Sequence, residues 1–400
     1  MSYIQLPIIT YKKRLENNIK FIYSEFPPLS PFLNKTLYSY LTNIKCEIDN
    51  CQTEWDKYKK YMNTYEYIHT PVSGSAHSIC KLSPLSRSYY KMIEISNILS
   101  VATELPSHAK TFHLAEGPGG FIEAIADLRK DISGKYNLND IYYGMTLIND
   151  SDTSIPGWRK TSEFKNKCSN FNIENGVDGK GDLTNVNNLN YCHNKYKGSI
   201  DLITGDGGFD FSVDFNNQEV ASAKLLFCQI AFATAMQKKG GTFIIKFFDT
   251  FTQFSSELIY LLTILYENVF FIKPCSSRQA NSEKYVVCKK FRLEDTTILV
   301  DKFTSVFQHI RKTYFITKIL NIKIPYILSV KIEEYNAICG QQQIESIANT
   351  LNLIENNKFD KLETLKKYNV LKCKQWCQKY KLPHHKNIVS NNVFLQNNRI

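Results

Sequence analysis

Short apolar runs and longer amphipathic segments alternate along the middle of the chain. Apolar runs predict strands, and apolar residues spaced by three and four predict helices. The predicted strands are Phe112–Ala115, Ile141–Met145, Ile200–Thr204, Thr242–Phe247, Val269–Lys273 and Tyr285–Lys289. The predicted helices are Ser88–Ser100, Phe121–Leu128, Gln218–Gln237 and Gln253–Tyr266. This alternation is typical of an α/β fold with a parallel sheet, and the last two strands are close enough to pair as an antiparallel hairpin.

The regions on either side have a different pattern. Residues 1–75 mix aromatic and charged residues in helix-like spacing, and within them Glu54–Tyr67 predicts an exposed, tyrosine-rich helix. Residues 296–400 lose the strand alternation and are expected to be mainly helical. We therefore predict a helical N-terminal extension over 1–75, an α/β domain over 76–295 and a mainly helical C-terminal region over 296–400.

The balance of charge points weakly to a phosphate-bearing partner. The chain of 400 residues carries 49 basic and 38 acidic residues, for a net charge of +11. Lysine and arginine that meet phosphates release condensed counterions, which favours binding to nucleic acid. Plain solvation and a lysine-rich codon usage explain the same excess, so the charge alone does not decide between them.

Cysteine usage and hydropathy indicate a protein of a reducing compartment. Eleven cysteines, an odd number, are scattered from Cys46 to Cys377 without a disulfide framework, and no cleavable signal sequence is recognised. The most apolar run, Leu258–Tyr266, is shorter than the roughly 20 residues that span a bilayer. We expect an intracellular protein, cytoplasmic rather than nuclear, with no membrane segment.

A glycine-rich turn, Glu116–Phe121, lies between a predicted strand and a predicted helix. Its glycines allow close approach of a ligand to the backbone, and the end of a strand in an open α/β sheet is where ligands bind. The turn is not the dinucleotide fingerprint, and the Glu116 carboxylate would repel a pyrophosphate. A carboxylate there suits a sulfonium cation, an amino group or a hydroxyl. A purely structural turn is the alternative.

Four further segments, taken with this turn, resemble the FtsJ-type ribose 2′-O-methyltransferases, particularly the branch that modifies mRNA caps. Asp206 in Asp201–Gly208, Lys246 in Gly241–Phe247 and Glu283 in Asn281–Tyr285 match three members of the family's Lys-Asp-Lys-Glu tetrad. The fourth precedes the turn, where Lys91 in Ser86–Ile95 fits and the neighbouring Arg87 is the alternative. The resemblance covers roughly residues 80–291, and its motifs occur in the family's order.

The resemblance implies a Rossmann-like methyltransferase fold, with a mostly parallel seven-stranded sheet and an antiparallel last strand. It implies S-adenosylmethionine as cofactor and RNA as substrate, with the capped 5′ end of mRNA favoured. It also implies that Lys91, Asp206, Lys246 and Glu283 are the catalytic residues. The residues expected at the cofactor are Glu116, Gly117, Pro118, Gly119, Gly120, Phe121, Asp182 and Asp206. Asp182 matches an aspartate that contacts the adenine amino group, although a turn aspartate is a common alternative. After the second strand, Gly144–Leu147 lacks an acidic residue for the cofactor's ribose.

The proposed chemistry explains why these residue types converge. A ribose hydroxyl must lose its proton as it attacks the methyl group, and a free lysine with a pKa near 10.4 is protonated at neutral pH. Burial and a second ammonium lower the pKa, so Lys91 beside Lys246 prepares Lys246 to act as base. Asp206 and Glu283 orient the lysines and partly oppose that shift.

Other signals in the sequence have plainer interpretations. Cys373, Cys377, His384 and His385 do not have the spacing of a common zinc finger, so no metal site is predicted. His113 is expected to be a core histidine inside its strand. Gly240 and Gly241 are expected to end the Gln218–Gln237 helix, with Lys238–Lys239 complementing its dipole.

The main alternatives in function are a catalytically inactive RNA-binding or scaffold subunit and a ribosomal or transfer RNA 2′-O-methyltransferase. A non-catalytic module has no need for a lysine inside an apolar strand, which argues against the first. Minimal ribosomal RNA methyltransferases of this family lack such long flanking regions, which argues against the second. A nicotinamide oxidoreductase is disfavoured by Glu116 and Pro118.

Overall fold

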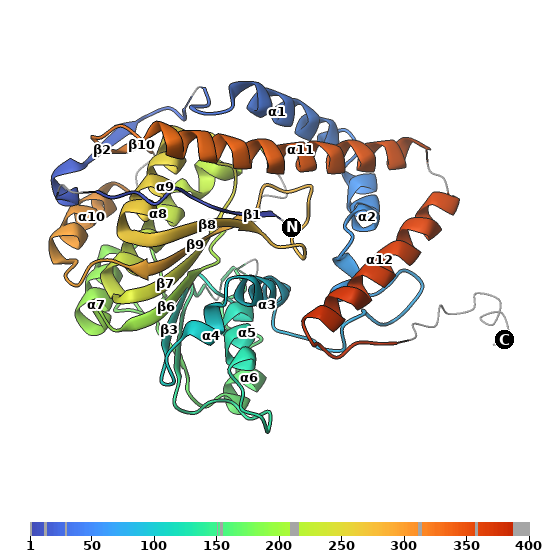
Figure 1. Ribbon diagram of the computed structural model, residues 1–400, viewed down its shortest axis with the longest axis horizontal. Coiled ribbons are helices and arrows are strands. Elements are labelled where there is room, and N and C mark those ends of the chain that lie inside the picture. Colours follow the sequence, from blue (N-terminus) through green and yellow to red (C-terminus); the bar gives the residue numbers. More distant parts are fainter. Residues whose placement is uncertain are drawn as a thin grey trace.

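The computed structural model describes residues 2–11, 14–28, 30–149, 151–152, 155–208, 216–310, 314–356 and 359–386. Within these residues, a mixed sheet of eight strands forms the centre of the molecule (Figure 1). In the order of the sheet, the strands are β1 (Ser2–Gln5), β8 (Tyr266–Lys273), β9 (Lys284–Phe291), β7 (Gln237–Phe247), β6 (Ile200–Gly205), β3 (Lys110–Leu114), β4 (Ile141–Met145) and β5 (Phe171–Ile173).

The strand directions confirm the predicted sheet and add one strand to it. The strands from β5 through β4, β3 and β6 to β7 are parallel to their neighbours, whereas β9 is antiparallel to both β7 and β8. Strands β3 to β9 therefore form the mostly parallel, seven-stranded sheet with an antiparallel last strand. The addition is β1, which pairs antiparallel with β8 at the edge.

Helices cover both faces of the sheet, and a second, two-stranded sheet lies outside them (Figure 1). The α-helices of the described chain are α1 (Lys35–Asp49), α2 (Gln52–Met62), α3 (Ser88–Ile98), α4 (Val101–Glu104), α5 (Gly120–Leu128), α6 (Ser162–Lys167), α7 (Val186–Tyr196), α8 (Gln218–Met236), α9 (Gln253–Leu265), α10 (Thr297–Ile310), α11 (Tyr326–Asn356) and α12 (Phe359–Lys379). The small sheet pairs β2 (Ile19–Ser24) with β10 (Phe315–Leu320). The predicted helices correspond to α3, α5, α8 and α9.

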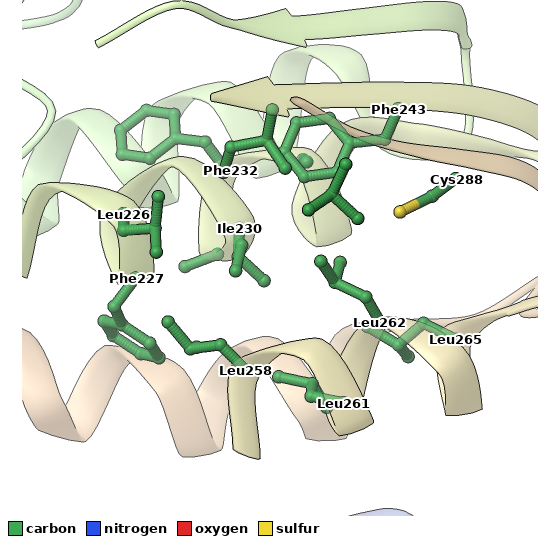
Figure 2. Close-up of a cluster of buried hydrophobic side chains, with 14 of the residues drawn as sticks. Leu226, Phe227, Ile230, Phe232, Phe243, Leu258, Leu261, Leu262, Leu265 and Cys288 are labelled. Atoms are coloured by element: carbon green, nitrogen blue, oxygen red, sulfur yellow. The ribbon is translucent and has the colours of Figure 1, made fainter. Parts of the chain in front are cut away.

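Two separate apolar clusters hold the helices on the sheet. The larger cluster joins α7, α8, α9 and α10 to one face, and Figure 2 shows its centre, where α8 and α9 meet the strands. The residues drawn there include Leu226, Phe227, Ile230 and Phe232 of α8, Leu258, Leu261, Leu262 and Leu265 of α9, and Phe243 and Cys288 of the sheet. The second cluster packs α3, α5 and the end of α12 on the opposite face. Side chains along β7 alternate between the two clusters, as expected for a strand buried on both sides.

Helix α8 is apolar around most of its circumference because it is covered on several sides. Among the described residues it is the one helix whose length and composition would allow it to cross a membrane, and 72% of its most apolar window is buried inside this fold. The predicted apolar run Leu258–Tyr266 lies mainly in α9, which is likewise buried. Both segments have the burial of core helices.

The N-terminal region was predicted to be helical, but it also contributes β1 and β2 to the two sheets. The prediction of an exposed helix over Glu54–Tyr67 is also wrong, both in its end and in its exposure. Helix α2 ends at Met62, and the aromatic side chains of Trp55, Tyr58 and Tyr67 are buried, with exposures of 4%, 6% and 0%. These side chains lie under α11 and α12, which sequence alone did not place there.

The predicted end of the Gln218–Gln237 helix is wrong. Helix α8 ends at Met236, and β7 begins with Gln237, so Gly240 and Gly241 lie inside the strand. The side-chain amide of Gln237 donates to the carbonyl of Ile200 at 2.9 Å, which ties the start of β7 to β6. Lys238 forms an ion pair with Asp201 at 3.1 Å and therefore does not complement a helix dipole.

The C-terminal region, mainly helical as expected, reaches back to the sheet through one buried carboxylate. Helix α11 lies along α1, and α12 crosses beneath it toward α3 (Figure 1). The indole N–H of Trp376 in α12 donates to Oε2 of Glu94 in α3 at 3.2 Å. Glu94 is 2% exposed and also accepts from the backbone N–H groups of Cys275 and Ser276, at 2.7 and 3.2 Å. Helix α12, helix α3 and the loop before β9 therefore meet at Glu94.

Replacing Trp376 by phenylalanine should destabilise the protein through the loss of this hydrogen bond. Because the acceptor is a buried carboxylate, we expect the free energy of unfolding to fall by about 1.5–3 kcal/mol beyond the effect of the smaller ring. Trp158→Phe is the matched control, since the indole N–H of Trp158 is buried without a hydrogen-bond partner. Urea unfolding measures both, and equal losses in the two variants would contradict the role of Glu94.

Candidate functional site

Strand alternation directs Lys246 toward α3. In β7, Phe243, Ile245 and Phe247 belong to the larger apolar cluster, whereas Ile244 belongs to the cluster on the α3 side. Because side chains alternate between faces, Lys246 points to the same side as Ile244. Lys246 lies near the carboxyl end of β7, where ligands bind in open α/β sheets.

Asp206 immediately follows β6 and meets Lys246. The ammonium of Lys246 lies 3.2 Å from Oδ1 of Asp206 and donates to the backbone carbonyl oxygen of Asp206 at 2.6 Å. The side chains are 12% and 15% exposed, so the ion pair is largely shielded from solvent. Asp206 thus holds Lys246 through both its side chain and its backbone.

Lys91 and Glu283 form a second buried ion pair, from α3 and the loop that leads into β9. The ammonium of Lys91 lies 2.6 Å from Oε1 of Glu283, and the side chains are 7% and 9% exposed. Ser277 donates to the same oxygen at 3.0 Å. Arg87, the alternative to Lys91, instead lies 3.5 Å from the carbonyl oxygen of Ser276. The structure therefore brings together the four residues of the predicted tetrad, with Lys91 rather than Arg87 among them.

Tyr285 connects the two ion pairs and was missed by the sequence reasoning. Its hydroxyl donates to Oδ1 of Asp206 at 2.9 Å and lies 3.5 Å from Oε1 of Glu283. Tyr285 is the partner of Lys246 in the β7–β9 register and is fully buried. A buried tyrosine hydroxyl needs a polar partner, and its position two residues after Glu283 places both on one face of the strand. That spacing was the available signal.

The surrounding charges shift the pKa values of Lys246, Lys91 and Glu283 in different directions. Burial lowers the pKa of Lys246, but the carboxylates of Asp206 and Glu283 outweigh burial and the pKa is raised. Burial also lowers the pKa of Lys91, and the opposing effect of Glu283 does not overcome it. Burial raises the pKa of Glu283, whereas Lys91 and Lys246 together hold it well below its usual range. The expected lowering of the Lys246 pKa is therefore wrong, because the two carboxylates oppose it fully rather than partly; the lowered pKa belongs to Lys91.

The glycine-rich turn lies beside the tetrad and presents an unpaired carboxylate oxygen. Glu116 is 3% exposed; its Oε1 accepts from the backbone N–H of Phe121, while its Oε2 is buried without a hydrogen-bond partner. Burial raises the pKa of Glu116, and the nearby carboxylate of Asp206 raises it further. A buried polar atom without a partner is the feature expected where a ligand supplies the missing hydrogen bond.

Sterics explain the glycines of the turn. A Cβ on Gly117 would lie 2.6 Å from the carbonyl oxygen of Gly157, and one on Gly120 would lie 2.2 Å from the hydroxyl of Ser86. Gly119 has φ +113°, a conformation that side chains disfavour. Pro118 follows a cis peptide bond. The side chain of Phe121, expected at the cofactor, packs in the core against Tyr285, with ring centroids 5.7 Å apart.

Asp182 belongs to a segment that packs near the end of β4, and its side chain is engaged in a turn. Its Oδ1 accepts from the backbone N–H and the hydroxyl of Thr184, at 2.8 and 2.7 Å. Gly181 packs so tightly that a Cβ would lie 2.2 Å from the carbonyl oxygen of Thr146. This contact brings the Gly181–Asp182 segment against the Gly144–Leu147 segment. The cofactor role and the turn role of Asp182 both fit this position.

Several residues set aside from the sequence have structural partners. His113 is fully buried, and its two ring nitrogens lie 2.9 and 2.8 Å from the hydroxyls of Thr111 and Thr204. Cys373 donates to the carbonyl oxygen of Thr64 at 3.3 Å, and His385 stacks on His77. Over the described ranges, no three His, Cys, Asp or Glu side chains are grouped so that they could hold a metal ion.

Comparison with known proteins identifies the family. The sequence profile of the FtsJ-like methyltransferases matches residues 84–291. The mouse cap-specific mRNA (nucleoside-2′-O-)-methyltransferase 1 is 38% identical over 182 residues, 44% of this chain and 21% of that protein. The Trypanosoma cruzi protein of the same name is 36% identical over 181 residues, 44% of this chain and 46% of that protein. The chain thus spans about a fifth of the mouse relative and under half of the trypanosome one.

Two solved structures are similar to this chain at low sequence identity. A putative ribosomal RNA methyltransferase from Plasmodium falciparum is 22% identical, with a TM-score of 0.36 over 52% of this chain and 98% of that one. Human methyltransferase-like protein 13 in complex with SAH is 9% identical, with a TM-score of 0.33 over 56% of this chain and 90% of that one.

The Lys91–Glu283 pair should make stability depend on pH in the acid range. The pKa of Glu283 is depressed in the folded state from an ordinary value of 4.5, so its contribution is complete above that value and is lost as pH falls. Glu283→Gln should lower stability by about 3–5 kcal/mol at pH 7, because Lys91 loses its buried partner. The deficit should shrink by about 1.4 kcal/mol per pH unit below 4.5.

Urea unfolding from pH 7 to pH 3 measures this difference. Glu163→Gln serves as control, because Glu163 forms an exposed ion pair with Lys167 on α6. A deficit for Glu283→Gln that stays constant with pH would show that the carboxylate is not held ionised by the lysines.

Proposed function

Because this chain belongs to the FtsJ-like methyltransferase family, we propose that it transfers a methyl group from S-adenosylmethionine to a ribose 2′-hydroxyl of RNA. The observation that carries the proposal is the pair of buried, cross-connected ion pairs, Lys246–Asp206 and Lys91–Glu283. Two buried lysines with matched carboxylates are costly to a fold, and this site lies where strands end and ligands bind. Perturbed pKa values in such a position support catalysis.

Lys246 is the proposed base. A hydroxyl oxygen that attacks the methyl carbon has to lose its proton, and the Lys246 amine accepts it. Asp206 fixes the direction of the amine through the two contacts to its side chain and backbone. Orientation of this kind accounts for much of the rate in such a displacement. Lys91 holds the Glu283 carboxylate in place, and the Tyr285 hydroxyl does the same for the Asp206 carboxylate.

The raised pKa of Lys246 sets a condition on this role. Asp206 favours the protonated amine, so Lys246 can accept a proton at neutral pH only when another positive charge offsets that carboxylate. When bound, S-adenosylmethionine supplies a methyl group on a positively charged sulfur. Asp206, which contacts Lys246, would then also be the carboxylate near that positive charge.

The residues proposed to hold the cofactor are those of the turn and the two neighbouring strand ends. The free oxygen of Glu116 suits an amino group or hydroxyl, and its neutral form, favoured by burial, suits a site that already contains Asp206. Gly117 and Gly120 allow the close backbone packing that shapes the turn. Asp182 completes the set, because the adjacent Gly181 packs against Thr146, the residue that follows β4.

The proposed substrate is the 5′ cap region of mRNA. Support comes from the mouse and trypanosome relatives, which carry cap-specific names and are 38% and 36% identical over 182 and 181 residues. Helices α1, α2, α11 and α12 surround that part with additional structure. All eleven cysteines are free thiols, which suits the reducing, cytoplasmic location that we also propose.

Removal of the Lys246 amine should abolish most of the activity. With Lys246→Ala we expect the rate of methyl transfer from labelled S-adenosylmethionine to capped RNA to fall by a factor of about 10²–10⁴, the usual contribution of a general base. Binding of S-adenosylhomocysteine should persist. Lys110→Ala, at the exposed start of β3, is the control and should retain activity.

The same assay separates the alternatives. Transfer to capped RNA but not to uncapped RNA of the same sequence supports the cap region as substrate. A wild-type chain that binds the cofactor and labels neither RNA supports an inactive, RNA-binding subunit. Full activity in Lys246→Ala overturns the proposed mechanism.

Glu116 should contribute directly to cofactor affinity. Glu116→Ala removes the buried oxygen that lacks a partner, so we expect the affinity for S-adenosylhomocysteine to fall by about 10–100-fold, as for loss of one hydrogen bond to a carboxyl group. Isothermal titration calorimetry measures the change against Glu163→Ala, which lies on the surface. Unchanged affinity in Glu116→Ala would exclude this oxygen as a ligand contact.

A further inference from the structure

Helix α12 and the segment after it carry an unusual share of the positive charge. Described residues 359–386 contain eight lysines and two acidic residues, a net charge of +6, while the whole chain of 400 residues has +11. The lysines are Lys361, Lys366, Lys367, Lys372, Lys374, Lys379, Lys381 and Lys386, and the acidic residues are Asp360 and Glu363. More than half of the net charge is therefore concentrated in these 28 residues, all outside the family-matched part of the chain.

Three of these lysines lie along one edge of α12. Lys361, Lys372 and Lys379 are 11 and 7 residues apart, spacings that return to the same side of a helix. Lys361 and Lys379 are exposed, and Lys372 is half-buried. At 1.5 Å per residue the edge is about 27 Å long. Tyr368, half exposed, lies on the same edge, with the Lys372 ammonium 5.4 Å from its ring centroid.

This edge of α12 lies near the loop that leads to Glu283 and β9. Lys372 and Lys379 stand one turn on either side of Trp376, which bonds to Glu94. Glu94 in turn binds the backbone of Cys275 and Ser276, in the loop that leads to Glu283, and lies one helical turn from Lys91. Burial raises the pKa of the Cys275 thiol to about 12, and the Lys379 ammonium opposes that effect, so Lys379 is within electrostatic reach of the loop.

We propose that the Lys361–Tyr368–Lys372–Lys379 edge of α12 binds the phosphate backbone of single-stranded substrate RNA next to the methylated nucleotide. Lysines interleaved with an exposed aromatic ring are the surface that single-stranded nucleic acid uses, since phosphates meet the ammonium groups and a base stacks on the ring. The edge begins near the loop that leads to Glu283 and runs away from it along α12. RNA bound along this edge would therefore contact the protein beyond the target ribose. This inference rests on the proposed RNA substrate and adds where the rest of the RNA lies.

The test compares two triple variants of the full chain. The edge variant, Lys361→Gln/Lys372→Gln/Lys379→Gln, removes the three lysines of the edge. The control variant, Lys20→Gln/Lys302→Gln/Lys323→Gln, removes three exposed lysines from β2, α10 and the segment after β10. These elements lie at the left of Figure 1, away from α12 at the right. Fluorescence anisotropy, without cofactor, measures binding of a capped single-stranded 20-nucleotide RNA and a capped trinucleotide over a range of salt concentrations. Both variants lose the same charge, so long-range electrostatics is matched.

For the edge variant, affinity for the 20-nucleotide RNA should fall about 50-fold at 0.15 M salt, and the slope of log affinity against log salt should flatten by about 2. Affinity for the trinucleotide should change less than twofold. In methyl-transfer assays KM for the long RNA should rise while kcat is retained. The control variant should bind both RNAs nearly as the wild type does.

Equal affinity and slope in the edge variant and the wild type would overturn the inference, and so would an equal loss in the control variant. A wild-type chain that does not bind the 20-nucleotide RNA overturns it as well. Binding is scored without catalysis, so failure of the proposed methyl transfer would be seen separately. Thermal unfolding of the three proteins checks that each variant is folded.

Discussion

The site depends on the balance of four buried charges. Lys91 and Lys246 contribute two positive charges, and Asp206 and Glu283 contribute two negative ones, all at 15% side-chain exposure or less. Taking any of these groups from water costs several kcal/mol, and the cost is recovered only when each meets an opposite charge and further hydrogen bonds. Loss of one member would leave a buried charge without its partner. The surrounding structure is therefore arranged to bring each charge to its partner.

Three features of the fold achieve this. Alternation along β7 turns Lys246 toward α3, and the antiparallel pairing of β9 with β7 sets Tyr285 opposite it, between the two carboxylates. Glu94 then fixes the remaining pair, because it lies on the helix that carries Lys91 and accepts from the loop that precedes Glu283. Glu94 also accepts from Trp376 in α12, 282 residues away in the chain. The C-terminal region is thereby part of the support of the site.

The sequence could predict what local pattern determines. Strands β3, β4, β6 and β7 were identified because parallel strands buried on both faces are continuous apolar runs. The tetrad was identified because its segments resemble the motifs of the FtsJ-type family and occur in the same order, and because a lysine inside an apolar strand, such as Lys246, is unusual. Tyr285 and Glu94 were missed, because a tyrosine in a strand and a glutamate in a helix look ordinary until distant partners are placed beside them. Strand β1 is too short to have a pattern, and the aromatic residues of α2 gave no sign that α11 and α12 cover them.

The two lysines of the site are not equivalent, although both are buried. Each faces one carboxylate at close range, yet the pKa of Lys246 is raised and that of Lys91 is lowered. Burial lowers both pKa values, but Arg87 adds positive charge near Lys91, whereas Glu283 adds a second negative charge near Lys246 beside that of Asp206. A positive charge next to Asp206 would lower the pKa of Lys246, because the Asp206 carboxylate is the largest charge that raises it. The proposed methyl donor carries such a charge, so under the proposed function cofactor binding and the readiness of Lys246 to accept a proton would be coupled through Asp206.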